Sequence, residues 1–233
     1  MSVEEVMRVH ADPLYLPRPP LVPPGENRFD DPTGHFVVRY TGATLYACLL
    51  ETMGWARRED IEAELSTVAG IDPTDRDPSM SEGIEDWLAS RKVARFTVIG
   101  DRSILEVNDP GLLTQLDKHP LVRWAIAESG LGTSLEPQHL DEALIRLGGP
   151  TGRRITKAVS RAVYEWHPDT ELLGYCSRHD DEAKCYAVYP SALPWDPTDV
   201  RPLDADRAED RDAVQRVGAL FEIDLPAHWQ DGW

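Results

Sequence analysis

Residues 36–55 read FVVRYTGATLYACLLETMGW, which predicts a strand followed by a helix. Its first five residues, Phe36 to Tyr40, are mostly β-branched or aromatic, which predicts a short strand. Thr44 then stands where a helix N-cap is expected, because its hydroxyl can accept a hydrogen bond from a free amide of the first turn. The helix should run to about Trp55. Its buried stripe is predicted by apolar residues at helical spacing, namely Leu45, Cys48, Leu49 and Met53.

The rest of the chain mixes helical patterns with short apolar runs. The further strands that we expect are 4–10, Ala94–Ile99, Ile104–Val107, Leu172–Cys176, Lys184–Tyr189 and Val200–Leu203. The further helices that we expect are Glu59–Val68, Ser81–Lys92, 110–117, 120–128, 137–147, Gly152–Glu165 capped by Thr151, and Arg207–Phe221. Gly100-Asp101-Arg102 resembles a hairpin turn. With 233 residues and no internal repeat, the pattern indicates one α+β or mixed α/β domain, with short-stranded sheets flanked by helices.

The chain is acidic, with 41 Asp and Glu against 24 Lys and Arg and a net charge of −17. This charge argues against direct nucleic-acid binding and against an anionic membrane surface, since both depend on Lys and Arg. No apolar stretch is long enough to cross a membrane, and the acidic N-terminus does not resemble a secretory signal. We therefore expect a cytoplasmic protein.

The chain has three cysteines, Cys48, Cys176 and Cys185. Because the number is small and odd, a disulfide framework is not expected. Cys176, His179 and Cys185 crowd together, but their spacing fits none of the usual zinc motifs, so we expect no metal. The phosphate-binding motifs of Rossmann dehydrogenases and of P-loop NTPases are also absent.

Residues 143–164 are basic in this acidic chain, and Arg153, Lys157 and Arg161 follow one another at helical spacing. Two interpretations stay open. The basic side chains could pair with acidic segments such as 204–212, or they could form an anion or partner site near the start of a helix.

Four short elements carry the residue types that an NAD pocket needs. Arg28 could hold a phosphate, Tyr40 could stack on nicotinamide, and Glu51 could hold the ribose while its glycosidic bond breaks. The fourth element is downstream, at 173–178, and contains Ser177. Its serine could supply a positioning hydrogen bond, or it could simply be satisfied by backbone.

These elements resemble, in order and spacing, the RES family, which is named for an Arg, a Glu and a Ser. Arg8 fits the arginine of the first strand, and Asn27-Arg28-Phe29-Asp30 fits the second arginine motif. Tyr40 follows an apolar strand, and Glu51 comes eleven residues later on the next helix. Gly174-Tyr175-Cys176-Ser177-Arg178 looks like the serine strand. The resemblance covers roughly residues 4–192.

The resemblance implies a fold like that of the ADP-ribosyltransferases and an enzyme that consumes NAD as a substrate, with no separate cofactor. Arg8 and Arg28 would hold the pyrophosphate, Tyr40 and Ser177 would complete the NAD site, and Glu51 would stabilise the ribosyl cation. The acceptor would be inorganic phosphate (a phosphorylase) or water (a glycohydrolase). The alternatives are ADP-ribose transfer to a macromolecule, and a silent interaction module in which Arg28 and Glu51 pair.

RES proteins are typically toxins of toxin–antitoxin pairs, so the resemblance also implies an Xre-type antitoxin as partner, and a homo-oligomer is conceivable. We expect a single RES-like domain over 1–233, with a helical insertion around 56–95 and an acidic C-terminal extension at 195–233. The whole stretch 56–150 is longer than a compact RES toxin would need. The proline-rich segment 13–24 could close over a ligand or form a fixed wall.

Overall fold

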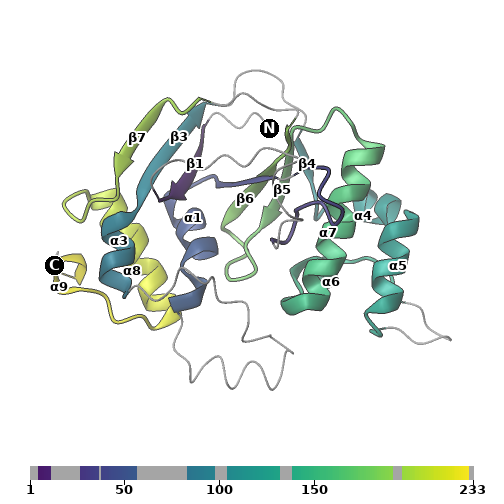
Figure 1. The fold of residues 1–233 in the computed structure, drawn as a ribbon. Helices are drawn as coiled ribbons and strands as arrows, with labels where there is room; N and C mark the ends of the chain where they lie inside the picture. Colours follow the sequence, from purple (N-terminus) through teal and green to yellow (C-terminus); the bar gives the residue numbers. More distant parts are fainter. Residues whose placement is uncertain are drawn as a thin grey trace.

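A computed structural model of the chain describes residues 5–11, 27–36, 38–56, 83–97, 104–131, 138–190 and 196–230. These residues form a mixed α/β arrangement in which one seven-stranded sheet is flanked by helices (Figure 1). The expected fold class, a single mixed α/β domain, is therefore confirmed.

The sheet is largely antiparallel. Its strands are β1 (Glu5–His10), β2 (Arg39–Gly42), β3 (Lys92–Thr97), β4 (Ile104–Glu106), β5 (Leu172–Cys176), β6 (Lys184–Val188) and β7 (Asp199–Pro202). Their order is β4-β5-β6-β2-β1-β3-β7, and β4 is the strand that runs parallel to its neighbour β5. The two central strands, β1 and β2, are joined by one residue pair, Met7 with Gly42.

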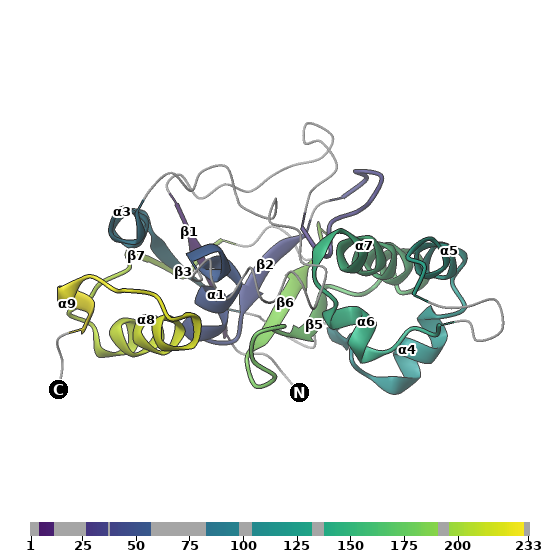
Figure 2. The same ribbon diagram turned by 90° about the horizontal axis from the view of Figure 1, so that it is seen from below.

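The helices gather in two groups (Figure 2). Those described are α1 (Leu45–Thr52), α3 (Ile84–Ser90), α4 (Pro110–Leu116), α5 (Pro120–Glu128), α6 (Glu142–Arg146), α7 (Gly149–Trp166), α8 (Ala208–Phe221) and α9 (Ala227–Gln230), with a 3-10 turn at Gly54–Ala56. Helices α4, α5 and α6 pack around α7 at one end of the sheet. Helix α1 packs against β1 and α8. None of the described helices is both long and apolar enough to cross a lipid bilayer.

Side chains alternate between the two faces of the sheet, and each face has its own apolar cluster. Met7, Tyr40 and Tyr175 lie on the face that packs against the helices and belongs to the main core. Val6 and Tyr186 lie on the opposite face, in a smaller cluster with Phe96 and Val188. This alternation decides which predicted site residues can meet.

The strand and helix predicted from residues 36–55 are present, with shifted ends. The helix cap is confirmed, because the Thr44 hydroxyl accepts from the Ala47 amide at 3.1 Å. The strand begins at Arg39, and Phe36 instead stacks on Tyr164 of α7 with ring centroids 4.4 Å apart. The strand extends to Gly42, where a Cβ would lie 2.9 Å from the Cys48 sulfur, so a side chain has no room there.

The hairpin predicted between the strands near 94–99 and 104–107 is wrong. Strand β3 pairs with β1 and β7, whereas β4 pairs with β5 at the opposite edge of the sheet. The turn 100–102 itself lies outside the described residues. A short polar turn does not show whether the two strands that flank it pair with each other or lie in distant parts of the sheet. That outcome depends on long-range strand pairing.

Several element boundaries differ from prediction. Thr151 does not cap the basic helix, which begins at Gly149 after the N-cap Gly148. The helix expected at 137–147 is shorter, at Glu142–Arg146, and that expected at Ser81–Lys92 is Ile84–Ser90. Most of the expected insertion, including helix Glu59–Val68, and the proline-rich segment 13–24 lie outside the described residues.

The acidic C-terminal part contributes to the main body. Strand β7 pairs with β3, and α8 buries Val214, Val217 and Phe221 in the main core. The two elements are joined by a buried ion pair, in which Arg201 binds both carboxylate oxygens of Asp210 at 2.5 and 2.7 Å.

Candidate functional site

Two of the predicted site residues are in direct contact. Ser177, which is fully buried just after β5, donates a hydrogen bond from Oγ to Oε1 of Glu51 on α1, and the two oxygens are 2.6 Å apart. Among the described residues, none binds the second carboxylate oxygen of Glu51. The Ser177 hydroxyl also accepts from the amide of His179 at 3.3 Å. The Ser177 hydroxyl is therefore bonded to a side chain, and not only to backbone groups as one interpretation expected.

The turn that follows Ser177 is held on α1 from a second point. The Tyr46 hydroxyl donates to the Asp180 carboxylate at 2.9 Å, and the Arg216 guanidinium lies 3.9 Å from the Tyr46 ring centre. The end of β5 and the helix that carries Glu51 are thus joined at two points.

Tyr40 connects the strand to the second arginine motif. Its hydroxyl accepts a hydrogen bond from the Phe29 amide at 2.7 Å. Burial raises the pKa of the Tyr40 phenol well above its usual value, and the nearby Asp30 carboxylate adds to the effect. The phenol is therefore neutral at physiological pH.

The loop 27–36 is built by two buried aspartates. Asp30 accepts from the amide and side chain of Asn27, both at 3.1 Å, and burial raises the pKa of its carboxyl. Asp31 is fully buried and accepts from the His35 amide at 2.6 Å. From α7, the Ser160 hydroxyl donates to the Phe29 carbonyl at 2.7 Å. These contacts fix the loop that presents Arg28.

Arg28 has unused hydrogen-bond donors. Its Nη2 donates to the Ile145 carbonyl at 2.5 Å, whereas Nε and Nη1 are buried and have no hydrogen-bond partner among the described residues. The guanidinium lies over the rings of Phe29 and Tyr175, 5.3 and 5.5 Å from their centres. A partly buried cation with unbonded N–H groups is suited to binding an anionic group of a ligand.

Tyr175 belongs to the same group, although sequence reasoning did not assign it a role. It is buried and stacks on Phe29 with ring centroids 4.8 Å apart. Burial raises the pKa of its phenol well above the usual value, and Glu51, Cys185 and Tyr40 add to the effect. The strand periodicity could have identified Tyr175 as a site residue. It stands two residues before Ser177, so both side chains point to the same face of the strand.

The structure does not bring Arg8 to this group. Arg8 pairs with Ala94 in the sheet, and Ala94 belongs to the cluster on the face opposite Tyr40. Burial lowers the pKa of the Arg8 guanidinium, an effect that the nearby Cys48 opposes. The four other predicted residues, Arg28, Tyr40, Glu51 and Ser177, share one face.

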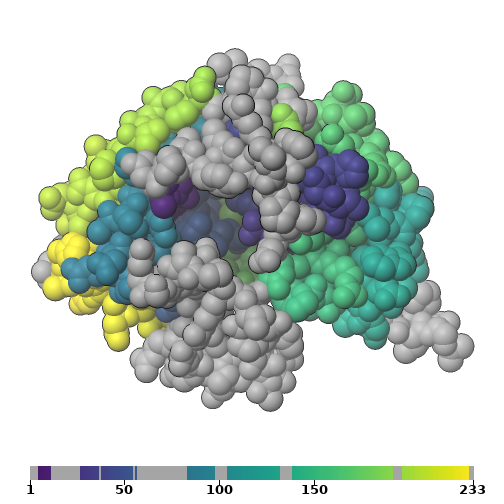
Figure 3. Space-filling model, in the orientation of Figure 1, coloured from purple at the N-terminus to yellow at the C-terminus, as the bar shows by residue number. Residues whose placement is uncertain are grey.

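The assembled group combines a fixed carboxylate, a neutral phenol and a partly buried guanidinium. Such a set can stabilise positive charge at Glu51 while it holds a negative group at Arg28. The surface is hollowed at the centre of the face seen in Figure 3. Indigo atoms from the part of the chain that contains α1, and green atoms from further along the chain, are visible there.

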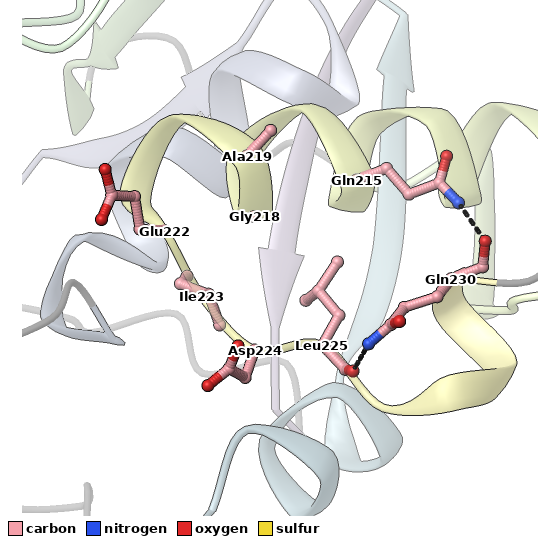
Figure 4. Close-up of a pocket in the computed structure, with 8 residues that line it drawn as sticks. All are labelled: Gln215, Gly218, Ala219, Glu222, Ile223, Asp224, Leu225 and Gln230. Carbon is pink, nitrogen blue, oxygen red and sulfur yellow. Dashed lines mark hydrogen bonds between the residues drawn. The ribbon is translucent and has the colours of Figure 1, made fainter.

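A separate depression of about 400 Å³ lies beside the C-terminal end of α8 (Figure 4). It is open, and it contains none of the predicted site residues. Gln215 and Gln230 close one side through hydrogen bonds to backbone carbonyls.

Two basic side chains of the segment 143–164 pair with acidic residues outside 204–212. Arg161 binds Glu165 at 2.6 Å and the buried Asp31 at 3.4 Å, and Arg146 pairs with Asp181. Within the described ranges, no three His, Cys, Asp or Glu side chains gather as metal ligands would.

Comparisons with known proteins give little help. No protein-family model matches the chain, and no curated protein matches it. Among solved structures, a chain of the M. tuberculosis MbcT–MbcA toxin–antitoxin complex matches with a TM-score of 0.45 and 14% identity. The match covers 93% of this chain and 89% of that chain. Neither value is high enough to transfer an activity or a partner.

Proposed function

We propose that the chain cleaves the bond between nicotinamide and ribose in NAD, and that Glu51 stabilises the ribosyl cation. The observation that carries the proposal is the Ser177–Glu51 hydrogen bond of 2.6 Å, which holds one carboxylate oxygen, while none of the described residues binds the other. A carboxylate in this position can bind a ribose hydroxyl and oppose the positive charge that develops as the bond breaks.

The reaction needs few catalytic groups. Nicotinamide leaves as a neutral molecule and takes the electron pair of the C–N bond, so no general acid is required. The ribosyl cation is then captured by an oxygen of phosphate or of water, and water loses a proton in the process. Electrostatic stabilisation by one preorganised group contributes roughly 3–4 kcal/mol in comparable enzymes.

The remaining residues would bind the substrate. Arg28 would donate its free Nε and Nη1 hydrogens to the pyrophosphate. Tyr40 would stack on the nicotinamide ring, whose positive charge suits an aromatic face. Tyr175, which lies against Arg28 and Phe29, would extend the aromatic wall. NAD would be the substrate, and no further cofactor is needed.

Two alternative functions make different use of these residues. In the silent module, Arg28 and Glu51 would pair with each other. In the described part of the chain Glu51 instead binds Ser177 and Arg28 binds the Ile145 carbonyl, which favours an enzyme. The second alternative, transfer of ADP-ribose to a macromolecule, would use the same groups with another acceptor.

The proposed biological role is that of a toxin restrained by an antitoxin, and it rests on the sequence resemblance to the RES family. An enzyme that depletes NAD would harm its own cell unless a partner blocked it. Expression of the chain alone should then lower cellular NAD and stop growth. Normal growth and normal NAD levels, with an active purified enzyme, would contradict the toxin role without affecting the proposed chemistry.

The chemistry is tested by incubating the purified chain with NAD, with and without inorganic phosphate, and resolving the products by proton and phosphorus NMR. The expected result is free nicotinamide, with either ADP-ribose or its phosphorylated form as the second product. ADP-ribose attached to protein would favour the transferase alternative. No loss of NAD under either condition would remove the enzyme proposal.

A further inference from the structure

The short helix α6 contacts both halves of the candidate site. It ends with two consecutive residues, Ile145 and Arg146. The Ile145 carbonyl accepts the hydrogen bond of 2.5 Å from Arg28 and so holds the guanidinium in place. The side chain of Arg146 reaches the turn that follows Ser177. One end of a helix is therefore connected both to the arginine motif and to the serine motif.

Arg146 binds the turn at two places. Its Nη2 donates a hydrogen bond to the Arg178 carbonyl at 3.4 Å, and its Nη1 pairs with the Asp181 carboxylate. Arg178 comes directly after Ser177 in the chain, so the first of these contacts lies one residue beyond the serine. A planar guanidinium that binds a carbonyl and a carboxylate together fixes the orientation of the turn as well as its position.

The turn is closed by hydrogen bonds of its own. The Ser177 amide donates to the Ala183 carbonyl at 2.8 Å, and the Ala183 amide donates to the Asp180 carbonyl at 3.1 Å. The Ser177 hydroxyl accepts from the His179 amide at 3.3 Å. Because these bonds join the turn to the serine, a displacement of the turn also displaces the hydroxyl that holds Glu51.

Two helices support this turn. Helix α1 reaches it through the Tyr46 hydroxyl, which donates to Asp180 at 2.9 Å, and α6 reaches it through Arg146. The first of these helices carries Glu51, whereas the second holds Arg28. With one support alone, the turn would be fixed relative to one half of the site. The two supports together fix the serine relative to both halves.

The spacing of the two halves matters to a substrate that spans them. NAD contains the reacting ribose and the pyrophosphate in one molecule, so Glu51 and Arg28 must stand at the separation that this molecule requires. The ion pair of Arg146 contributes little to stability, because 74% of the Asp181 side chain is exposed and exposed pairs are weak. Its effect on the position of the turn can therefore be measured apart from an effect on folding.

From these contacts we infer that Arg146 is a positioning residue for the proposed cleavage of NAD. It fixes the turn after Ser177 against the helix that holds Arg28, and it thereby determines where the serine holds Glu51. Arg146 acts through the serine and not on the substrate. The inference rests on the proposed function, since it assigns Arg146 a role in that reaction.

The first test compares steady-state cleavage of NAD by the parent chain and by Arg146→Ala. Because Arg28 keeps its bond to the Ile145 carbonyl in this variant, the loss should fall on the turnover number. We expect turnover about tenfold lower, with KM changed less than about twofold. The midpoint of urea unfolding should stay close to that of the parent. Arg146→Lys keeps the charge but not the planar fork, and it should recover part of the turnover.

The matched control is Arg123→Ala on α5. Like Arg146, Arg123 binds one backbone carbonyl and one carboxylate, which belong to Gln138 and Asp117. Neither of these partners lies in the turn after Ser177. The control should therefore cleave NAD at the parent rate. A loss of turnover equal to that of Arg146→Ala would show a general effect of removing a surface arginine and would overturn the inference.

A double-mutant cycle shows whether Arg146 acts through Ser177. In Ser177→Ala the hydroxyl that holds Glu51 is already gone, so adding Arg146→Ala should lower turnover no further. Independent effects that multiply in the double variant would overturn the inference, as would parent-like turnover in Arg146→Ala. No cleavage by the parent chain would overturn the proposed function and this inference with it. An active parent with an equally active Arg146→Ala overturns the inference alone.

Discussion

Glu51 and Ser177 are 126 positions apart in the chain, yet the Ser177 hydroxyl lies 2.6 Å from a Glu51 carboxylate oxygen. The contact depends on the pairing of β5 with β6 and of β6 with β2, which places the end of β5 over the helix after β2. The contact therefore brings together two motifs that are far apart in the sequence.

Loss of the Ser177 hydroxyl should impair the positioning of Glu51. We expect Ser177→Ala to lower the rate of NAD cleavage about tenfold to a hundredfold, because a small displacement of a catalytic group is costly. Ser129→Ala is the control, since its hydroxyl binds a carbonyl at the end of α5. Initial rates of nicotinamide release provide the measurement, and equal rates for both variants would argue against a role for the serine.

Arg28 should act mainly in substrate binding. Arg28→Ala is expected to weaken NAD binding roughly tenfold to a hundredfold and to lower the rate, because hydrogen bonds to charged groups contribute about 1.5–3 kcal/mol each. Arg28→Lys should restore part of the affinity, since it keeps the charge and loses the planar fork. The exposed Arg207→Ala serves as control. Unchanged affinity in Arg28→Ala would place the pyrophosphate elsewhere.

The ring and the hydroxyl of Tyr40 should have separable effects. Tyr40→Phe leaves the Phe29 amide without its acceptor, and we expect it to lower the free energy of unfolding by about 1–3 kcal/mol. NAD affinity should change only a few-fold, because the ring is kept, whereas Tyr40→Ala should lose affinity strongly. Urea unfolding and NAD titration measure the two quantities. If both variants lose affinity equally, the hydroxyl, not the ring, binds the substrate.

Two adjacent acidic residues of α8 should differ sharply in their importance for stability. Asp210 is fully buried and paired with Arg201, so Asp210→Ala should cost about 3–5 kcal/mol by leaving a buried cation unpaired. Glu209 pairs with Arg95 at the surface, with 53% of its side chain exposed, so Glu209→Ala should cost at most about 1 kcal/mol. Urea denaturation of both variants measures the difference. Equal losses would contradict the buried-pair assignment.

Local sequence signals predicted local structure well. The Thr44 cap, the apolar stripe of α1 and the strand at Leu172–Cys176 all follow from spacing and residue type within one element. The mistaken hairpin before β4 reflects a long-range choice that no turn residue encodes. The start of β2 was misplaced because Phe36 is apolar through its contact with α7 and not through strand pairing.

Which candidate residues share a face was predictable where they follow a sequence motif, and less so where strand register determines the face. Arg28, Tyr40, Glu51 and Ser177 lie on one face, as a common site requires. Arg8 was grouped with them by sequence order, but its pairing with Ala94 turns it to the other face. Since neighbouring strand residues point to opposite sides, an error of one position in register would reverse that result, and sequence alone did not define the register.

The most direct measurement compares Glu51→Gln with the parent chain in NAD cleavage, followed as nicotinamide release by proton NMR. The proposed mechanism predicts a rate at least about a hundredfold lower with NAD affinity nearly unchanged, because the carboxylate acts as charge develops in the transition state. The exposed Glu128→Gln should behave like the parent, and unfolding curves should confirm that each variant is folded. Near-normal turnover by Glu51→Gln would contradict the account.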